Sequence, residues 1–232
     1  MGISHYLAMT GVEIAAAEAL PENIAYMACH FSPYGTGLTG PVQALPPQSM
    51  LILNDRIPFC GHDIQYIGQQ LAQWAADLHC SCLLLDFQRP PVPESEQMVQ
   101  AIVSQLPCSA AFPPAYAQNW DGPVFLPPCP LHVPLEEYLE PWKGREIWLE
   151  AALCQETINI IKDGPVFTPQ FPPEGLDGGF FDDGLCCQYT THTSPEEISF
   201  TLFDTRESLL RKLEKAHSLG VTRAVGLYQE LG

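Results

Sequence analysis

Short apolar runs recur along the chain, and most of them end in a turn that is rich in proline or glycine. They lie at residues 23–31, 49–54, 82–87, 109–112, 124–126, 146–153 and 223–228. The runs do not alternate cleanly with polar residues, which is typical of strands that are buried on both faces. Several prolines stand just after a run, where no ladder hydrogen bond is lost. The runs are therefore interpreted as the strands of a buried sheet.

Helical segments lie between these runs. Residues 62–78 carry apolar side chains at spacings of three and four, which form one stripe along a helix. Residues 95–106 are predicted to begin at the capping residue Ser95, and residues 205–219 are predicted to end at Gly220. Strands that alternate with helices imply parallel strands joined by crossover connections.

Seven or eight such units within 232 residues predict an α/β fold, a compact (β/α)8 TIM-like barrel that spans residues 1–232 as a single domain. The segment 107–134 is dense in proline, so its helices are predicted to be short or missing. Residues 170–192 are interpreted as a long, acidic, glycine-rich excursion. A doubly wound parallel sheet is the alternative fold.

The balance of charge excludes some classes of partner. The chain has 27 acidic residues against 10 basic ones, and its formal net charge is −17. Such a field repels phosphate backbones and anionic lipids, so neither nucleic acid nor a membrane is expected as a partner. No apolar run approaches the ~20 residues that a membrane-spanning helix needs. The first twenty residues show no secretory signal.

The nine cysteines are an odd number and include no C-x-x-C pair. Most of them lie in or beside apolar runs, where a cysteine behaves as a small hydrophobic residue. This usage favours a reducing cytoplasm. A zinc site is the alternative, but Cys80-x-Cys82 and Cys186-Cys187 do not have the spacing of zinc ligands. We therefore expect neither a metal nor a cofactor.

Two segments carry a resemblance to a known family. The first is S-C-L-L-L-D-F-Q at residues 81–88, which follows a long helical segment. The second begins with the run 198–203 and continues as D-T-R-E-S-L-L-R-K-L, a glycine at position 220 and a last run that ends in Tyr228. Together these segments resemble glycoside hydrolase family 18, the chitinase-like (β/α)8 barrels that include spore cortex-lytic enzymes.

The resemblance implies a chemistry that this chain lacks in part. The motif of the family is D-x-x-D-x-D-x-E on the fourth strand, and Ser81, Leu84, Asp86 and Gln88 stand at its four acidic positions. The last Glu protonates the glycosidic oxygen, while the neighbouring Asp orients the N-acetyl group of the substrate, which acts as the nucleophile. An amide is not a general acid, so Gln88 cannot replace that Glu.

The resemblance therefore implies a catalytically degenerate barrel that binds an amino-sugar glycan or is an inactive relic. Alternating strand positions place Asp86 and Gln88 on the same side, inside the barrel. A structural role for Asp86 is the alternative, because a buried Asp at a strand end commonly accepts backbone N–H groups or pairs with an arginine such as Arg89.

Other carboxylates offer a second function, an active glycosidase. Asp55 follows an apolar run at the expected carboxyl end of a strand, and Glu150 lies in the run 146–153, while Glu156 and Glu230 are further candidates. Two carboxylates ~5–9.5 Å apart would form an ordinary glycosidase pair. Each of them is otherwise a solvated acid at the rim of the barrel.

Aromatic side chains could stack on sugar rings, and the candidates for binding a glycan are Tyr34, Tyr116, Trp148 and Tyr228. The resemblance places Tyr228 where the family usually has a tryptophan under the sugar. The alternative for each aromatic residue is an ordinary place in the core. A third class of function is a structural or interaction protein whose acidic surface meets a basic partner.

Overall fold

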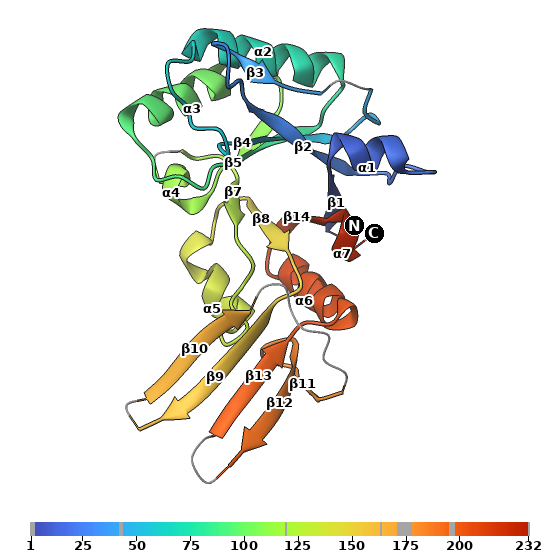
Figure 1. Cartoon of the computed structure of the whole chain (residues 1–232), viewed down its shortest axis with the longest axis vertical. Coiled ribbons are helices and arrows are strands. Elements are labelled where there is room, and N and C mark those ends of the chain that lie inside the picture. The colour runs from blue at the N-terminus through green and yellow to red at the C-terminus, as the bar shows by residue number, and fades with distance from the viewer. Residues whose placement is uncertain are drawn as a thin grey trace.

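Eight parallel strands form a barrel in the part of the chain that the computed structural model describes, residues 3–41, 44–118, 120–162, 164–170, 178–194 and 198–231 (the side chain of residue 28 is excluded). Figure 1 shows this barrel with a second sheet extending away from it. Its strands are β1 (Ser4–Met9), β2 (Ile24–Phe31), β4 (Met50–Asn54), β5 (Cys82–Asp86), β6 (Ser109–Ala111), β7 (Val124–Leu126), β8 (Ile147–Ala151) and β14 (Val221–Leu227).

Each barrel strand pairs with the next barrel strand along the chain, and β14 pairs in parallel with β1. The ring closes between β6 and β7, where Phe112 forms a parallel bridge to Val124. At this bridge the backbone N–H of Phe125 donates to the carbonyl oxygen of Phe112 at 2.8 Å. The prediction of a (β/α)8 barrel is confirmed, and a doubly wound open sheet is excluded because its strand order would reverse at a switch point.

One apolar cluster draws side chains from all eight strands and therefore fills the interior of the barrel. Its buried members are Tyr6, Ala8, Ala25, Met50, Ile52, Cys82, Leu84, Ala111, Phe125, Trp148 and Val225. A second and larger cluster joins the outer faces of the strands to the surrounding helices. These two clusters explain why the predicted strands read as continuous apolar runs, because both faces of each strand are buried.

The helices surround the barrel, and α4, which lies in the proline-rich segment 107–134, has only four residues, as the sequence predicts. They are α1 (Gly11–Ala16), α2 (Ile64–Asp77), α3 (Pro93–Gln105), α4 (Pro114–Ala117), α5 (Leu135–Leu139) with the 3-10 turn η1 (Glu140–Trp142), α6 (Arg206–Ser218) and α7 (Tyr228–Leu231). No helix joins β2 to β4 within the described residues of that connection, where the two-residue strand β3 (Leu38–Thr39) pairs with β2 instead.

Two details of the helix ends test the predicted caps. Gly220 follows α6 with φ of +101°, as expected of a glycine that ends a helix. Ser95 is not the N-cap of α3, because the helix begins two residues earlier at Pro93. Its hydroxyl instead donates to the carbonyl oxygen of Val92 and accepts the N–H of that residue, each at 2.9 Å.

An antiparallel sheet is inserted between β8 and α6, and the sequence did not predict it. Its strands run in the order β10-β9-β13-β12-β11. They are β9 (Gln155–Ile161), β10 (Gly164–Gln170), β11 (Phe180–Asp182), β12 (Cys187–Thr193) and β13 (Ile198–Phe203). The predicted excursion at 170–192 lies partly outside the described residues, at 171–177, and its remainder includes β11 and β12. That the chain is a single domain stays a prediction.

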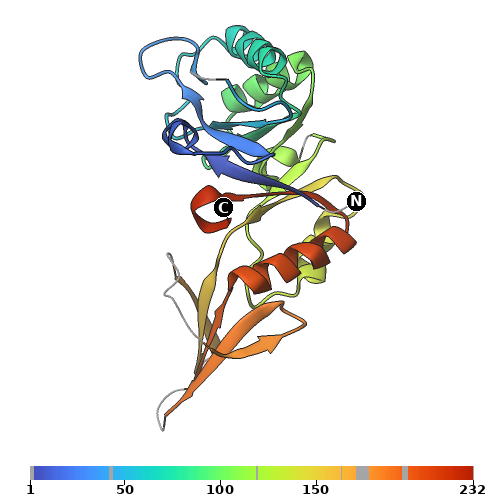
Figure 2. The same ribbon diagram turned by 90° about the vertical axis from the view of Figure 1, so that its right-hand side faces the viewer.

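A buried ion pair joins the inserted sheet to the barrel. Asp204 directly follows β13, and Lys212 of α6 donates to its two carboxylate oxygens at 2.8 and 3.0 Å. The same carboxylate accepts the N–H of Cys154, which lies just before β9. Both ends of the insertion are therefore held at one point, and Figure 2 shows α6 beside the sheet at this junction. None of the described helices is both long enough and apolar enough to cross a bilayer.

Candidate functional site

A pocket of about 810 Å³ opens at the carboxyl ends of β2, β4 and β5. Its lining residues are Thr10, Met27, His30, Ile52, Asn54, Asp55, Arg56, Ile57, Asp86, Gln88 and Arg89. This is the end of the barrel at which TIM-barrel enzymes place their chemistry, because the loops after the strands converge there. The pocket therefore includes both polar residues that end the predicted fourth strand.

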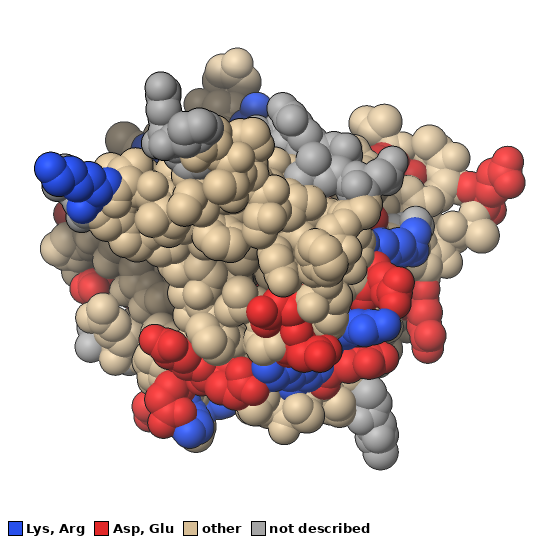
Figure 3. Space-filling model, turned by 90° about the horizontal axis from the view of Figure 1, so that it is seen from below, with Lys and Arg blue, Asp and Glu red and all other residues tan. Residues whose placement is uncertain are grey.

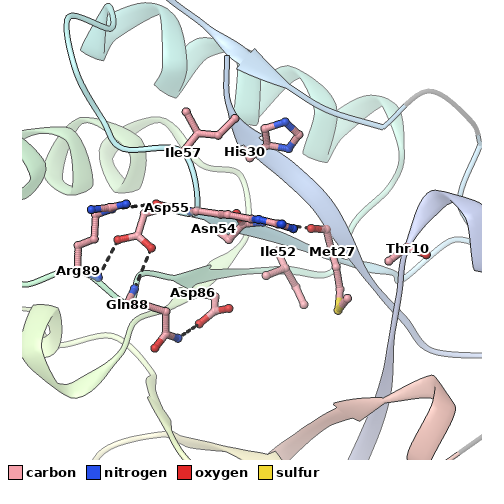
Figure 4. A pocket seen from close by; sticks show the side chains of 11 residues that line it. Thr10, Met27, His30, Ile52, Asn54, Asp55, Ile57, Asp86, Gln88 and Arg89 are labelled. Atoms are coloured by element: carbon pink, nitrogen blue, oxygen red, sulfur yellow. Dashed lines mark hydrogen bonds between the residues drawn. The ribbon is translucent and has the colours of Figure 1, made fainter. Parts of the chain in front are cut away.

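Asp86 and Gln88 project from the end of β5 to the same side and line the pocket together (Figure 4). The side-chain amide of Gln88 donates to Asp86 Oδ1 at 2.5 Å. Burial raises the pKa of the Asp86 carboxyl, the Gln88 hydrogen bond opposes that rise, and the nearby Asp55 carboxylate adds to it. The pair thus presents one carboxylate and one amide to the mouth of the barrel.

Asp55 holds the turn after β5, and its role as a catalytic carboxylate stays a prediction. Asp55 is only 6% exposed. One of its carboxylate oxygens accepts the backbone N–H of Gln88 at 2.9 Å, and the other accepts that of Arg89 at 2.8 Å. These are the contacts that the sequence offered as a structural role for Asp86, and the structure assigns them to Asp55. Both oxygens therefore hold the backbone of the turn beside the pocket.

The neighbouring Asn54 was not among the candidates, although it directly precedes Asp55 at the end of the same apolar run. Its side-chain amide donates to the carbonyl oxygens of Met27 at 3.2 Å and Cys29 at 3.0 Å. The pairing of β2 with β4 shifts register between Tyr26 and Cys29, so Asn54 holds the irregular stretch of β2 that carries Met27 into the pocket. The one sequence signal that could have indicated Asn54 is its place at the end of an apolar run.

Glu150 lies on β8 and is the most strongly perturbed carboxyl near the mouth. Although the residue reaches solvent, burial within the mouth raises the pKa of its carboxyl to about 7, and the Asp86 and Glu230 carboxylates add to the rise. Glu230 of α7 accepts the N–H of Leu153 at 3.2 Å, which fixes α7 beside the end of β8. The carboxylates of Asp86 and Glu230 therefore act on Glu150 across the barrel mouth.

The four aromatic candidates do not line this pocket. Trp148 is fully buried inside the barrel, where its indole N–H donates to Glu146 before the strand, so it occupies the place in the core that was its alternative. Tyr116 is 8% exposed, and its hydroxyl donates to the carbonyl oxygen of Arg89 at 3.2 Å. That these two residues bind a sugar stays a prediction. Tyr34 is 97% exposed on a loop, and Tyr228 packs against the core at the start of α7.

Within the described ranges no three His, Cys, Asp or Glu side chains gather as metal ligands. The nine cysteines form no disulfide.

Charge is unevenly spread over the surface. The view onto the end of the second sheet shows Lys, Arg, Asp and Glu side chains gathered along one side (Figure 3). Ion pairs such as Lys215–Glu136 and Arg211–Glu207 occur on the helices α5 and α6. Part of the acidic excess is therefore balanced locally.

The fold is a (β/α)8 barrel with a polar mouth and a sheet inserted after its seventh strand. No protein-family model and no curated protein matches the sequence, but solved structures match the fold. The spore cortex-lytic enzyme SleL of Bacillus cereus has a TM-score of 0.59 at 10% identity, over 97% of this chain and 70% of its own.

A family 18 N-acetylglucosaminidase from Paenibacillus barengoltzii has a TM-score of 0.59 at 9% identity, over 99% of this chain and 98% of its own. The class V chitinase from Nicotiana tobaccum reaches 0.60 at 9% identity, over 100% and 95% of the two chains. At such identities the likeness shows the fold alone. The chain has the fold of glycoside hydrolase family 18, as its two motif segments predict.

Proposed function

We propose that this protein binds an amino-sugar glycan in the mouth of its barrel and does not cleave it by the family 18 mechanism. The observation that carries the proposal is the pair at the end of β5, where the amide of Gln88 donates to the carboxylate of Asp86. A proton donor is required at the position of Gln88, and an amide has no proton to give near neutral pH. The loss of such a donor lowers a rate by about 10²–10⁴-fold.

The same pair is suited to binding. Gln88 has amide N–H groups and a carbonyl oxygen, and Asp86 has a second carboxylate oxygen, so together they can donate to and accept from sugar hydroxyl and N-acetyl groups. Two solved chitinases of this fold support the idea. Structures from Nicotiana tobaccum and Cycas revoluta carry a Glu-to-Gln mutation and are in complex with NAG4 and (GlcNAc)4. In those proteins a Gln in place of a Glu is compatible with a bound oligomer.

One observation favours a second candidate, an active glycosidase that uses Glu150. Burial and the carboxylates of Asp86 and Glu230 raise the pKa of Glu150 to about 7, which is the range in which a carboxyl can donate a proton at neutral pH. In this alternative Glu150 is the general acid and Asp86 is its ionised partner. The acid would then come from β8 instead of β5.

The variant Gln88→Glu separates the two candidates. If the mouth binds a GlcNAc oligomer in the family geometry, Gln88→Glu restores a donor beside Asp86 and creates measurable hydrolysis of (GlcNAc)4, whereas the wild type has none. Asp86→Asn in the same background is the control, because it removes the carboxylate that would orient the N-acetyl group. Hydrolysis by the wild type that disappears in Glu150→Gln would establish the second candidate instead.

The cellular location belongs to the same proposal. We place the protein in a reducing cytoplasm, and the free state of its cysteines supports this. Burial raises the pKa of Cys29 and of Cys187 to about 12, so these thiols stay protonated and behave as small apolar side chains. Seven of the nine cysteines are buried, Cys108 is half-buried and Cys60 is exposed.

A further inference from the structure

We infer that Asp55 is a positioning residue for the binding site, and that its carboxylate sets the place of the Gln88 amide; this inference rests on the proposed function. The turn after β5 begins where the N–H of Phe87 donates to the carbonyl oxygen of Leu85 at 3.1 Å. Beyond that point the chain leaves the sheet, so no strand neighbour fixes Gln88 or Arg89.

Asp55 supplies the fixation from the neighbouring strand. It follows β4 directly, and each of its carboxylate oxygens accepts one backbone N–H of the turn, from Gln88 at 2.9 Å and from Arg89 at 2.8 Å. The Arg89 side chain closes the arrangement, because its Nε–H donates to the backbone carbonyl oxygen of Asp55 at 3.2 Å. Hydrogen bonds to an ionised acceptor are roughly twice as strong as neutral ones.

The turn is also held from its other side. The hydroxyl of Tyr116 donates to the carbonyl oxygen of Arg89 at 3.2 Å, and it contacts Ser95 of α3 at 3.3 Å. Asp55 and Tyr116 therefore hold the N–H and C=O groups of one short turn from opposite elements. The side chain that depends on this turn is Gln88, whose amide must lie over Asp86 to form the 2.5 Å hydrogen bond.

The consequence for the mouth is chemical as well as geometric. The Gln88 hydrogen bond lowers the pKa of the Asp86 carboxyl against the effect of burial. If Asp55 no longer holds the turn, Gln88 leaves Asp86, and the loss of this hydrogen bond raises the pKa of Asp86. Removal of the Asp55 charge by itself has the opposite and smaller effect, because that charge raises the pKa of Asp86 less than the Gln88 hydrogen bond lowers it. This change in Asp86 is a readout that a general loss of stability would not produce.

The test uses Asp55→Asn, with Tyr116→Phe as a second variant and Asp63→Asn as the matched control. An asparagine can accept only one of the two N–H groups, so the Gln88 and Arg89 amides should exchange with solvent about tenfold faster. Tyr116→Phe keeps the ring packing and removes the one hydroxyl that contacts Arg89 and Ser95, so its effect on the turn should be smaller and in the same direction. Asp63 also accepts a backbone N–H, that of Tyr66, but it does not line the pocket.

Carbon-13 NMR titration of Asp86 and binding of (GlcNAc)4 complete the experiment. In Asp55→Asn the pKa of Asp86 should rise, because the lost Gln88 hydrogen bond outweighs the lost Asp55 charge. The affinity for (GlcNAc)4 should fall about tenfold, while Asp63→Asn should stay within about twofold of the wild type. A lowered or unchanged pKa of Asp86 in the folded Asp55→Asn protein overturns the inference, because loss of the Asp55 charge alone lowers it. A wild type that binds no glycan, together with a raised pKa of Asp86 in Asp55→Asn, refutes the proposed function and leaves the positioning role of Asp55 supported.

Discussion

The ion pair between Asp204 and Lys212 gives the sharpest test of how the inserted sheet is attached. Their side chains are 1% and 7% exposed, and the ammonium group lies 2.8 Å from the nearer carboxylate oxygen. Lys212→Met keeps most of the length and apolar volume of the side chain, so the main change is a buried carboxylate without its cation. Breaking a buried pair in this way costs about 3–5 kcal/mol.

A second replacement shows whether charge is the cause. In the double variant Asp204→Asn with Lys212→Met no charge remains, while the single side-chain oxygen of position 204 can still accept either the N–H of Cys154 or the hydroxyl of Ser208, which contact different oxygens of Asp204. The double variant should therefore recover most of the loss and unfold within about 1–2 kcal/mol of the wild type. Urea unfolding followed by tryptophan fluorescence measures these free energies. A loss below 1 kcal/mol in Lys212→Met would refute the account of this junction.

Three further predictions follow from other parts of the molecule. The pKa of Glu150 is about 7 in the folded protein, against an ordinary value of 4.5. Ionisation of Glu150 therefore lowers the stability of the folded protein as the pH rises from 4.5 through 7. Glu150→Gln should raise the melting temperature at pH 8 and leave it unchanged near pH 4. Gly226→Ala should destabilise the barrel by about 1–3 kcal/mol in urea unfolding, because the added methyl group would lie 2.5 Å from the carbonyl oxygen of Ala151. Ellman's reagent should modify one thiol quickly in the native protein, and Cys60→Ser should abolish that phase, because Cys60 is the exposed cysteine.

Much of the barrel could be predicted from the sequence because its strands are buried on both faces and stand out as apolar runs. Seven of the eight strands correspond to such runs, and the missing one, β1, has two exposed residues, Ser4 and His5, at its start. In the inserted sheet only β13 corresponds to such a run, 198–203. The strands β9 and β12 mix Thr, Asn and Gln with apolar residues and stay partly exposed, so neither a continuous run nor a clear alternation marks them.

The candidate site could be predicted where strand periodicity decides the outcome and not where loop geometry does. Asp86 ends β5 and Gln88 lies two residues beyond it, and alternation predicts that they lie on one side, as Figure 4 shows. Trp148 and Glu150 are also two apart, but Trp148 is fully buried while Glu150 reaches solvent, because they differ in depth along the barrel axis, which periodicity does not give. The role of Asp55 depends on the turn after another strand, so only the folded chain shows that its carboxylate accepts the N–H groups of Gln88 and Arg89.

The most direct test of the central claim is one incubation of the wild-type protein with (GlcNAc)4, in which binding and product formation are measured on the same sample. Labelled protein reports binding through the NMR signals of the Gln88 side-chain amide and the Asp86 carboxyl, and chromatography reports any shorter oligomer. A tetramer of glucose is the control for recognition of the N-acetyl groups. The account predicts saturable shifts of both signals with the tetramer left intact. Release of shorter oligomers by the wild type, or signals that do not move, would contradict it.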